Sequence, residues 1–188
     1  SFLRLKHTWK SLILMKYVVT GGAGFIGSHL VKHLLSEGHD VTIVDNMFRG
    51  RLSNLDGFLE KINLIQLDIL DYEKLRNCIK NADGIFHQAA LTSVVESYQK
   101  ENEYHKVNVI GTENIFKIAK EFSIKVVYAS SSSVYGNITK IPITETFDRK
   151  PINPYGKTKL DDEYLSENFV KSGSEIIGLR YFNVYGLG

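Results

Sequence analysis

Short apolar runs alternate along most of the chain with longer segments of mixed polarity. The runs are rich in Val and Ile and almost continuously apolar, which is typical of strands buried on both faces of a parallel sheet. The pattern predicts strands at residues 16–20, 41–45, 62–68, 84–88, 124–130 and 175–181.

The segments between these strands carry apolar residues at helical spacing. They predict helices over residues 25–37, 72–80, 100–122 and 154–171. Gly38 follows the first of them, where a glycine cap is typical. Because strands that alternate with helices are joined by right-handed crossovers, the chain is expected to form a doubly wound α/β fold around a parallel sheet.

The composition is that of one ordinary globular domain. Of 188 residues, 43% are hydrophobic and 23% are charged, which argues against disorder. The net charge of +2 provides no strong field for nucleic acid or a membrane surface, so neither partner is expected. The single Cys78 excludes an internal disulfide and a cysteine-based metal cluster, and it fits a reducing, cytoplasmic location.

Residues 1–14 precede the first strand and mix apolar with basic side chains. They contain neither the long apolar run of a membrane span nor the cleavage pattern of a signal peptide. We interpret Met15 as the natural start and residues 1–14 as an extension without a role in the fold. An ordered helix that packs on the domain is the alternative.

The first strand and first helix are joined by a glycine-rich turn. Gly22, Gly24 and Gly27 match G-x-G-x-x-G, and Thr20, Gly21, Gly24 and Gly27 match T-G-x-x-G-x-x-G. Glycines there let backbone N–H groups and the helix N-terminus approach a pyrophosphate. In a strand–turn–helix context, the motif predicts a dinucleotide site.

Two carboxylates follow at the ends of the next strands. Asp45 lies where a carboxylate binds the adenosine ribose, which favours NAD because the charge repels the additional phosphate of NADP. Arg49 and Arg51 leave NADP as the alternative. Asp68 is placed to meet the adenine amino group, or it caps a turn.

The fourth strand ends in the small residues Ala89 and Ala90, which would let a cofactor lie flat against the backbone. His87, just before them, is interpreted as a packed strand residue rather than a ligand. The other histidines have no metal-binding spacing, so no metal site is expected.

A Y-x-x-x-K motif begins the last predicted helix. Asn153 is a suitable N-cap and Pro154 a suitable first residue, so Tyr155 falls in the first turn and Lys159 one turn later on the same face. The helix N-terminus and the ammonium both favour an ionised phenol, which can act as a general base toward a sugar hydroxyl. A surface tyrosine beside a solvated lysine is the alternative.

Two further features accompany this motif. A serine run, ASSSSVYG over residues 129–136, ends the fifth strand at the sheet edge where ligands bind, and its hydroxyls either orient a substrate alcohol or form a polar turn. Asn108 falls on the apolar stripe of the 100–122 helix, and a buried amide needs partners. It is predicted to hold the active-site lysine or a water, or to be a satisfied core amide.

Taken together, these motifs resemble those of the extended short-chain dehydrogenases/reductases, specifically the NAD-dependent nucleotide-sugar epimerase/dehydratase family. The resemblance runs from Met15 to the last residue. It rests on Thr20-Gly21-x-x-Gly24-x-x-Gly27, Asp45-Asn46, Asp68-Ile69, Ala89-Ala90, Asn108, the serine run, Tyr155-x-x-x-Lys159 and Arg180-Tyr-Phe-Asn183-Val-Tyr-Gly186.

The resemblance implies a role for each matching residue. Tyr155 is the implied base, Ser131 the catalytic serine and Lys159 the residue that binds the nicotinamide ribose and polarises the tyrosine. The implied NAD contacts are Gly21, Gly24, Phe25, Ile26, Gly27, Asp45, Asn46, Asp68, Ile69, Ala89, Ala90, Asn108, Tyr155, Lys159 and Tyr181. The implied substrate contacts are Ser131, Ser132, Tyr155 and Asn183.

The subtype follows from what stands beside Ser131. The family's dehydratases and decarboxylases carry acids there, whereas this chain has Ser132 and Ser133. The resemblance therefore favours a UDP-hexose 4-epimerase that oxidises C4 transiently to a 4-keto sugar and returns the hydride to the opposite face. A reductase, a dehydratase, another epimerase and an incompetent NAD-binding fragment are the alternatives.

The resemblance also implies a domain division and a partner. Residues 15–181 would form the NAD-binding domain and residues 182–188 the start of a substrate domain, most of which lies beyond this chain. A homodimer would form through the helices at 100–122 and 154–171.

Overall fold

The structure, a computed structural model, describes residues 14–187. The predicted N-terminal extension therefore lies, apart from Leu14, outside the described residues. Within the described part of the chain, no helix has the length and apolar character needed to cross a bilayer.

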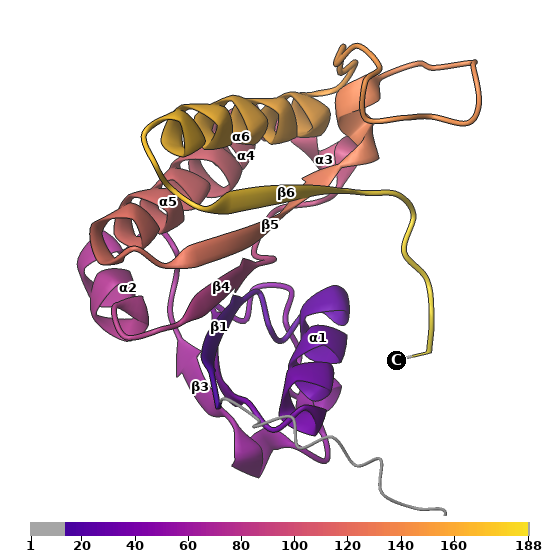
Figure 1. Cartoon of the computed structure of the whole chain (residues 1–188). Helices are drawn as coiled ribbons and strands as arrows, with labels where there is room; N and C mark the ends of the chain where they lie inside the picture. Colours follow the sequence, from indigo (N-terminus) through magenta and orange to yellow (C-terminus); the bar gives the residue numbers. More distant parts are fainter. Residues whose placement is uncertain (1–13, 188) are drawn as a thin grey trace, which may run out of the picture.

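Six parallel strands form one sheet in the order β3-β2-β1-β4-β5-β6 (Figure 1). They are β1 (Lys16–Thr20), β2 (Asp40–Asp45), β3 (Asn63–Gln66), β4 (Gly84–His87), β5 (Lys125–Ser131) and β6 (Ile176–Tyr181). The order reverses between β1 and β4, as in doubly wound dinucleotide-binding folds. The predicted fold class is thus confirmed, with strand ends shifted by one or two residues.

Helices cover both faces of the sheet (Figure 1). They are α1 (Phe25–Ser36), α2 (Tyr72–Ile79), α3 (Val94–Gln99), α4 (Glu101–Tyr104), α5 (Gly111–Phe122) and α6 (Pro154–Lys171). Neighbouring strand residues point to opposite faces, so Val18 joins the core under α2 and α5, whereas Val19 joins the core under α1. Because both faces of each strand are buried, the strands read as continuous apolar runs in the sequence.

The predicted helix at 100–122 is interrupted by a π-helical segment, η3 (His105–Ile110), which lies between α4 and α5. π segments within α-helices are frequent at functional sites, and this one contains Asn108. The sequence analysis missed α3, although Ser93 and Glu96 form the S-x-x-E pattern of a capped helix start. Ser93 Oγ accepts a hydrogen bond from Glu96 N at 3.2 Å.

Three 3₁₀ segments were also not predicted: η1 (Leu52–Leu55), η2 (Leu59–Lys61) and η4 (Ser132–Tyr135). Beyond β6 the chain runs back toward α1 (Figure 1), where His29 Nε2 lies 2.9 Å from Leu187 O. The assignment of residues 182–188 to a second domain stays a prediction.

Candidate functional site

A cavity of about 270 Å³ opens at the carboxyl ends of the strands, around the point where the strand order reverses. Its walls include eight residues predicted to contact a cofactor: Gly21, Gly24, Asp45, Asn46, Asp68, Ile69, Ala89 and Ala90. These residues come from four separate turns of the chain. The cavity therefore brings together the glycine turn and the ends of β2, β3 and β4.

The glycine turn lies closely against the chain that follows β4. Gly21 has φ +68°, and a Cβ on it would lie 2.7 Å from Ala89 N. A Cβ on Gly27 would lie 2.2 Å from Gly21 O. Only glycine fits at both places, and the close approach presents backbone to the cavity, as a pyrophosphate requires.

Asp45 is held in place by the backbone around it. Its Oδ2 accepts from Ala23 N at 3.0 Å and its Oδ1 from Met47 N at 2.9 Å. Two backbone N–H donors thus fix the position of this carboxylate beside the cavity. The fixed negative charge suits a ribose hydroxyl and opposes a phosphate at the same position.

Arg49, which kept NADP open as an alternative, is engaged elsewhere. Its Nη2 lies 2.7 Å from Glu96 Oε1 and 2.8 Å from Glu96 Oε2, on α3. Arg49 lines the cavity, and the Glu96 carboxylate offsets the charge of its guanidinium there. Together with Asp45, this arrangement fits an unphosphorylated ribose, so the residues present fit NAD.

Several wall residues were not predicted: Val44, Phe48, Gly50, Leu67, Leu91, Glu103 and Val107. Phe48 and Gly50 belong to the irregular segment after β2, and Glu103 and Val107 belong to α4 and the π segment. Periodicity gives no sign of such positions, since they depend on how loops fold over the sheet edge.

The serine run after β5 packs against the first turn of α6 through a glycine contact. Ser131 is the last residue of β5, and Tyr155 is in the first turn of α6, where Asn153 Oδ1 accepts from Gly156 N at 2.7 Å. A Cβ on Gly156 would lie 2.7 Å from Ser133 O. The missing side chain lets the serine run pack directly on the turn that carries Tyr155.

Lys159 is buried, which rules out the solvated lysine of the alternative interpretation. Its exposed fraction is 2%, and its Nζ lies 3.2 Å from Asp162 Oδ2, one turn further along α6. The sequence analysis missed Asp162, although its i,i+3 spacing from Lys159 on one helix was a readable signal.

Asn108 is fully buried and is not among the residues that line the cavity, and its role as a cofactor contact stays a prediction. Its Oδ1 accepts from Leu91 N at 2.8 Å, and its Nδ2 donates to Leu91 O at 3.0 Å and to Thr158 Oγ1 at 3.1 Å. The amide thus joins the chain after β4 to the residue that precedes Lys159. These bonds match the satisfied core amide of the alternative interpretation.

Other predicted contacts also lie away from the cavity wall: Phe25, Ile26, Gly27, Tyr155, Lys159 and Tyr181. Tyr181 pairs with Ser131 across β5 and β6 and lines a separate hollow beside Arg180. Asn183 is exposed in the segment after β6, and Ser132 begins η4. Their assigned roles stay predictions.

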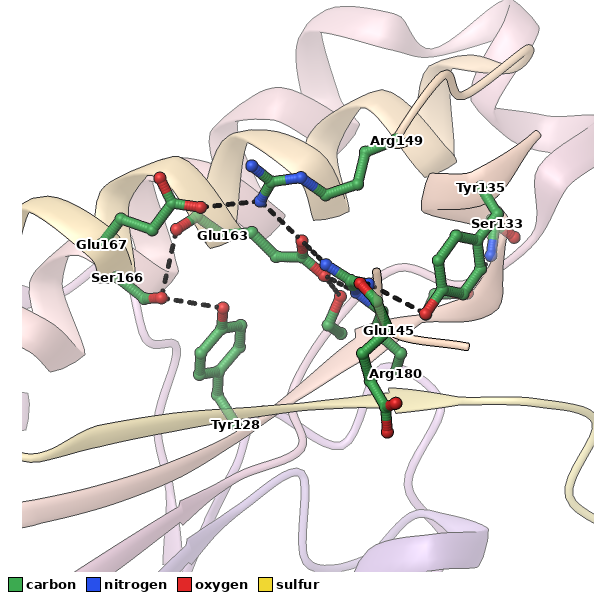
Figure 2. Close-up of polar contacts among 11 residues, drawn as sticks. Tyr128, Ser133, Tyr135, Glu145, Arg149, Glu163, Ser166, Glu167 and Arg180 are labelled. Atoms are coloured by element: carbon green, nitrogen blue, oxygen red, sulfur yellow. Dashed lines mark hydrogen bonds and ion pairs between the residues drawn. The ribbon is translucent and has the colours of Figure 1, made fainter. Parts of the chain in front are cut away.

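A polar cluster around Glu163 fixes the end of β5 against α6 (Figure 2). Glu163 accepts from Ser130 Oγ at 2.7 Å, from Arg149 Nη1 at 3.0 Å and from Arg180 Nε and Nη2 at 2.8 Å. Burial opposes the charge, but these donors hold the pKa of Glu163 below its usual range. Ser130 is the neighbour of Ser131, so the cluster helps to fix the position of Ser131.

His87 lies in a buried row of hydrogen bonds. Its Nδ1 is 2.6 Å from Thr20 Oγ1 and its Nε2 is 2.9 Å from Thr112 Oγ1, whose hydroxyl donates to Asn108 O. This pattern assigns the proton to Nε2. Burial and the nearby Lys159 charge lower the pKa of His87 to about 3, so the ring is neutral and serves packing, as predicted.

His87 makes the fold sensitive to acid. Its folded pKa lies below the unfolded value of 6.5, so the stability it provides is complete above that value and is lost as the pH falls. We expect the free energy of unfolding to fall by about 2 kcal/mol more between pH 7 and pH 5 in the wild type than in His87→Gln. Urea unfolding measures this, with the exposed His33→Gln as control. Equal losses in all three proteins would contradict it.

The comparisons with known proteins agree with this geometry. A model of the NAD dependent epimerase/dehydratase family matches residues 17–188. The UDP-N-acetyl-alpha-D-glucosaminuronate decarboxylase of Bacillus cytotoxicus is 37% identical over 175 residues, covering 90% of this chain and 54% of that protein. The UDP-glucose 4-epimerase of Lacticaseibacillus casei is 38% identical over 176 residues, covering 92% and 52%.

Among solved structures, a UDP-N-acetylglucosamine 4-epimerase from Methanobrevibacter ruminantium in complex with UDP-N-acetylmuramic acid superposes with a TM-score of 0.88 at 38% identity. The match covers 92% of this chain and 56% of that one. The chain spans about half the length of the curated relatives it matches.

Proposed function

Because the chain belongs to the NAD-dependent epimerase/dehydratase family, we propose that it is the NAD-binding part of a nucleotide-sugar 4-epimerase acting on UDP-hexoses. The cofactor is NAD. The observation that carries the subtype is the serine run at 130–133, which holds no acid and packs through Gly156 on the turn that carries Tyr155.

When bound, NAD supplies the reversible oxidation of a sugar carbinol. The chain's own residues handle binding and protons. The glycine turn, Asp45 and the small residues after β4 hold the dinucleotide at the sheet edge. Tyr155 takes the proton of the C4 hydroxyl and later returns it, while Ser131 orients that hydroxyl. Lys159 contributes the positive charge one turn away from Tyr155 on the same face of α6.

The lack of an acid beside Ser131 argues against the sister reactions. A dehydratase must protonate a leaving hydroxyl, and Ser132 and Ser133 stand where the related dehydratases and decarboxylases carry carboxylates. Glu163, which contacts Ser130, has both oxygens bound by arginine side chains. Decarboxylation of a UDP-sugar acid is the second candidate function, because a decarboxylase is among the relatives.

The test is to titrate the chain with NAD and then with UDP-glucose by calorimetry, and to follow the sugar by NMR. An epimerase converts UDP-glucose to its C4 epimer with no net change in NADH. Net consumption of NADH would point to a reductase, and loss of carbon dioxide from UDP-glucuronate to a decarboxylase. Binding of NAD without binding of any UDP-sugar would show a cofactor-binding unit alone.

Two further assignments belong to this proposal. The homodimer is proposed to form through the helices at 100–122 and 154–171, and the exposed apolar side chains of Ile110, Tyr164 and Val170 on them support this. Cys78 is free, which is in keeping with the cytoplasm.

A further inference from the structure

Asp162 is a completely buried carboxyl group beside the lysine of the site. The side chains of Lys159 and Asp162 have exposed fractions of 3% and 0%. Asp162 Oδ2 accepts a hydrogen bond from the Lys159 ammonium. Its Oδ1 is buried and has no hydrogen-bond partner within residues 14–187. A buried carboxylate needs partners for both oxygens, so this one is poorly suited to permanent charge.

The groups around Asp162 come from four elements. They are Lys159, Asp161 and Glu163 on α6, Thr112 on α5, Tyr128 on β5 and, through Thr112, His87 on β4. His87 is neutral, and burial raises the pKa of Tyr128, so that phenol also stays neutral. Glu163 is bound by Arg149 and Arg180. The ammonium of Lys159 is therefore the cation that Asp162 balances.

We propose that Asp162 is a positioning residue that holds the Lys159 ammonium and, by gaining or losing its proton, controls how much of that charge acts on Tyr155. The consequence for turnover rests on the proposed function. The burial of Asp162 and its contact with Lys159 do not.

The direction follows from the two charges. Burial raises the pKa of Asp162 to about 7, with Lys159 opposing the shift. Below that pH the carboxyl is neutral, and the ammonium acts undiminished on the phenol one turn away. Above it the carboxylate offsets the ammonium, so less positive charge favours the ionised form of Tyr155 that takes the C4 proton, and kcat/KM declines.

The first test needs no substrate. Carbon-13 NMR of the side-chain carboxyl, assigned by its loss in Asp162→Asn, should show Asp162 titrating near neutral pH. The ring Cζ signal of Tyr155 should show a step at the same pH, absent in Asp162→Asn. Titration of Asp162 below pH 5, or a Tyr155 signal without that step, overturns the proposal whether or not the chain is an epimerase.

The second test is the pH profile of kcat/KM. The wild type should lose about three- to tenfold as Asp162 ionises, and Asp162→Asn should lack this step. Asp161→Asn is the matched control, since it removes the same charge from the adjacent, partly exposed position. A purely structural role would lower activity at every pH alike, and a step that persists in Asp162→Asn overturns the proposal.

Discussion

Replacing Tyr155 with phenylalanine is expected to lower the rate of UDP-sugar epimerisation about 10³-fold, because the group that takes the C4 proton is removed. The affinity for NAD should stay within about twofold, since the cavity wall is formed by other residues. Turnover is measured by NMR of the sugar and affinity by calorimetry. A loss of turnover with unchanged NAD affinity indicates lost proton transfer, whereas a loss of both indicates a damaged site.

Tyr164→Phe is the matched control for this variant. Tyr164 lies on the same helix, is 48% exposed and stacks on Arg149, whose Cζ lies 4.9 Å from the ring centroid. Loss of its hydroxyl should leave both turnover and NAD binding unchanged. Comparable turnover in Tyr155→Phe and the wild type would exclude Tyr155 as the base.

Glu163→Gln is expected to lower the free energy of unfolding by about 3 kcal/mol, because it leaves two partly buried guanidinium groups without their shared carboxylate. The side chains of Arg149 and Arg180 are only 24% and 18% exposed. Urea unfolding at neutral pH provides the measurement.

Glu167→Gln tests whether burial causes this loss. Glu167 binds the same Arg149 at 2.7 Å, but its side chain is 45% exposed, so its loss should cost less than about 1 kcal/mol. The pKa of Glu163 is lowered by folding, so its contribution is present above the unfolded value of 4.5 and is lost as the pH falls through the folded value. The difference between Glu163→Gln and the wild type should therefore shrink in acid. Equal costs for the two variants at neutral pH would refute the argument.

The sheet was predictable because each strand is buried on both faces, so its apolar character is continuous and its ends are marked by turn residues. The glycine turn was predictable for a related reason, since close backbone contacts exclude side chains at Gly21 and Gly27. Local sequence carries both signals. Neither the strands nor the glycine turn requires knowledge of which distant segment packs against them.

The rest depended on such distant contacts. The amide of Asn108 is committed to Leu91 and Thr158, 17 and 50 residues away, and no spacing in the sequence shows that. The π segment, the loop residues at the cavity wall and the pairing of Arg49 with Glu96 arise in the same way. For Asp162, the helical spacing was visible, but its burial was not.

The row through Thr20, His87 and Thr112 has a consequence for folding kinetics. Thr20 and His87 are 67 residues apart in sequence and sit at the ends of neighbouring central strands. A polar group of this row that became buried before its partners arrived would lack a hydrogen bond, so the row can be buried only when β1, β4 and α5 have come together. Closing so long a loop is slow. The centre of the sheet should therefore gain hydrogen-exchange protection late and all at once, after α1 and β2 have joined β1.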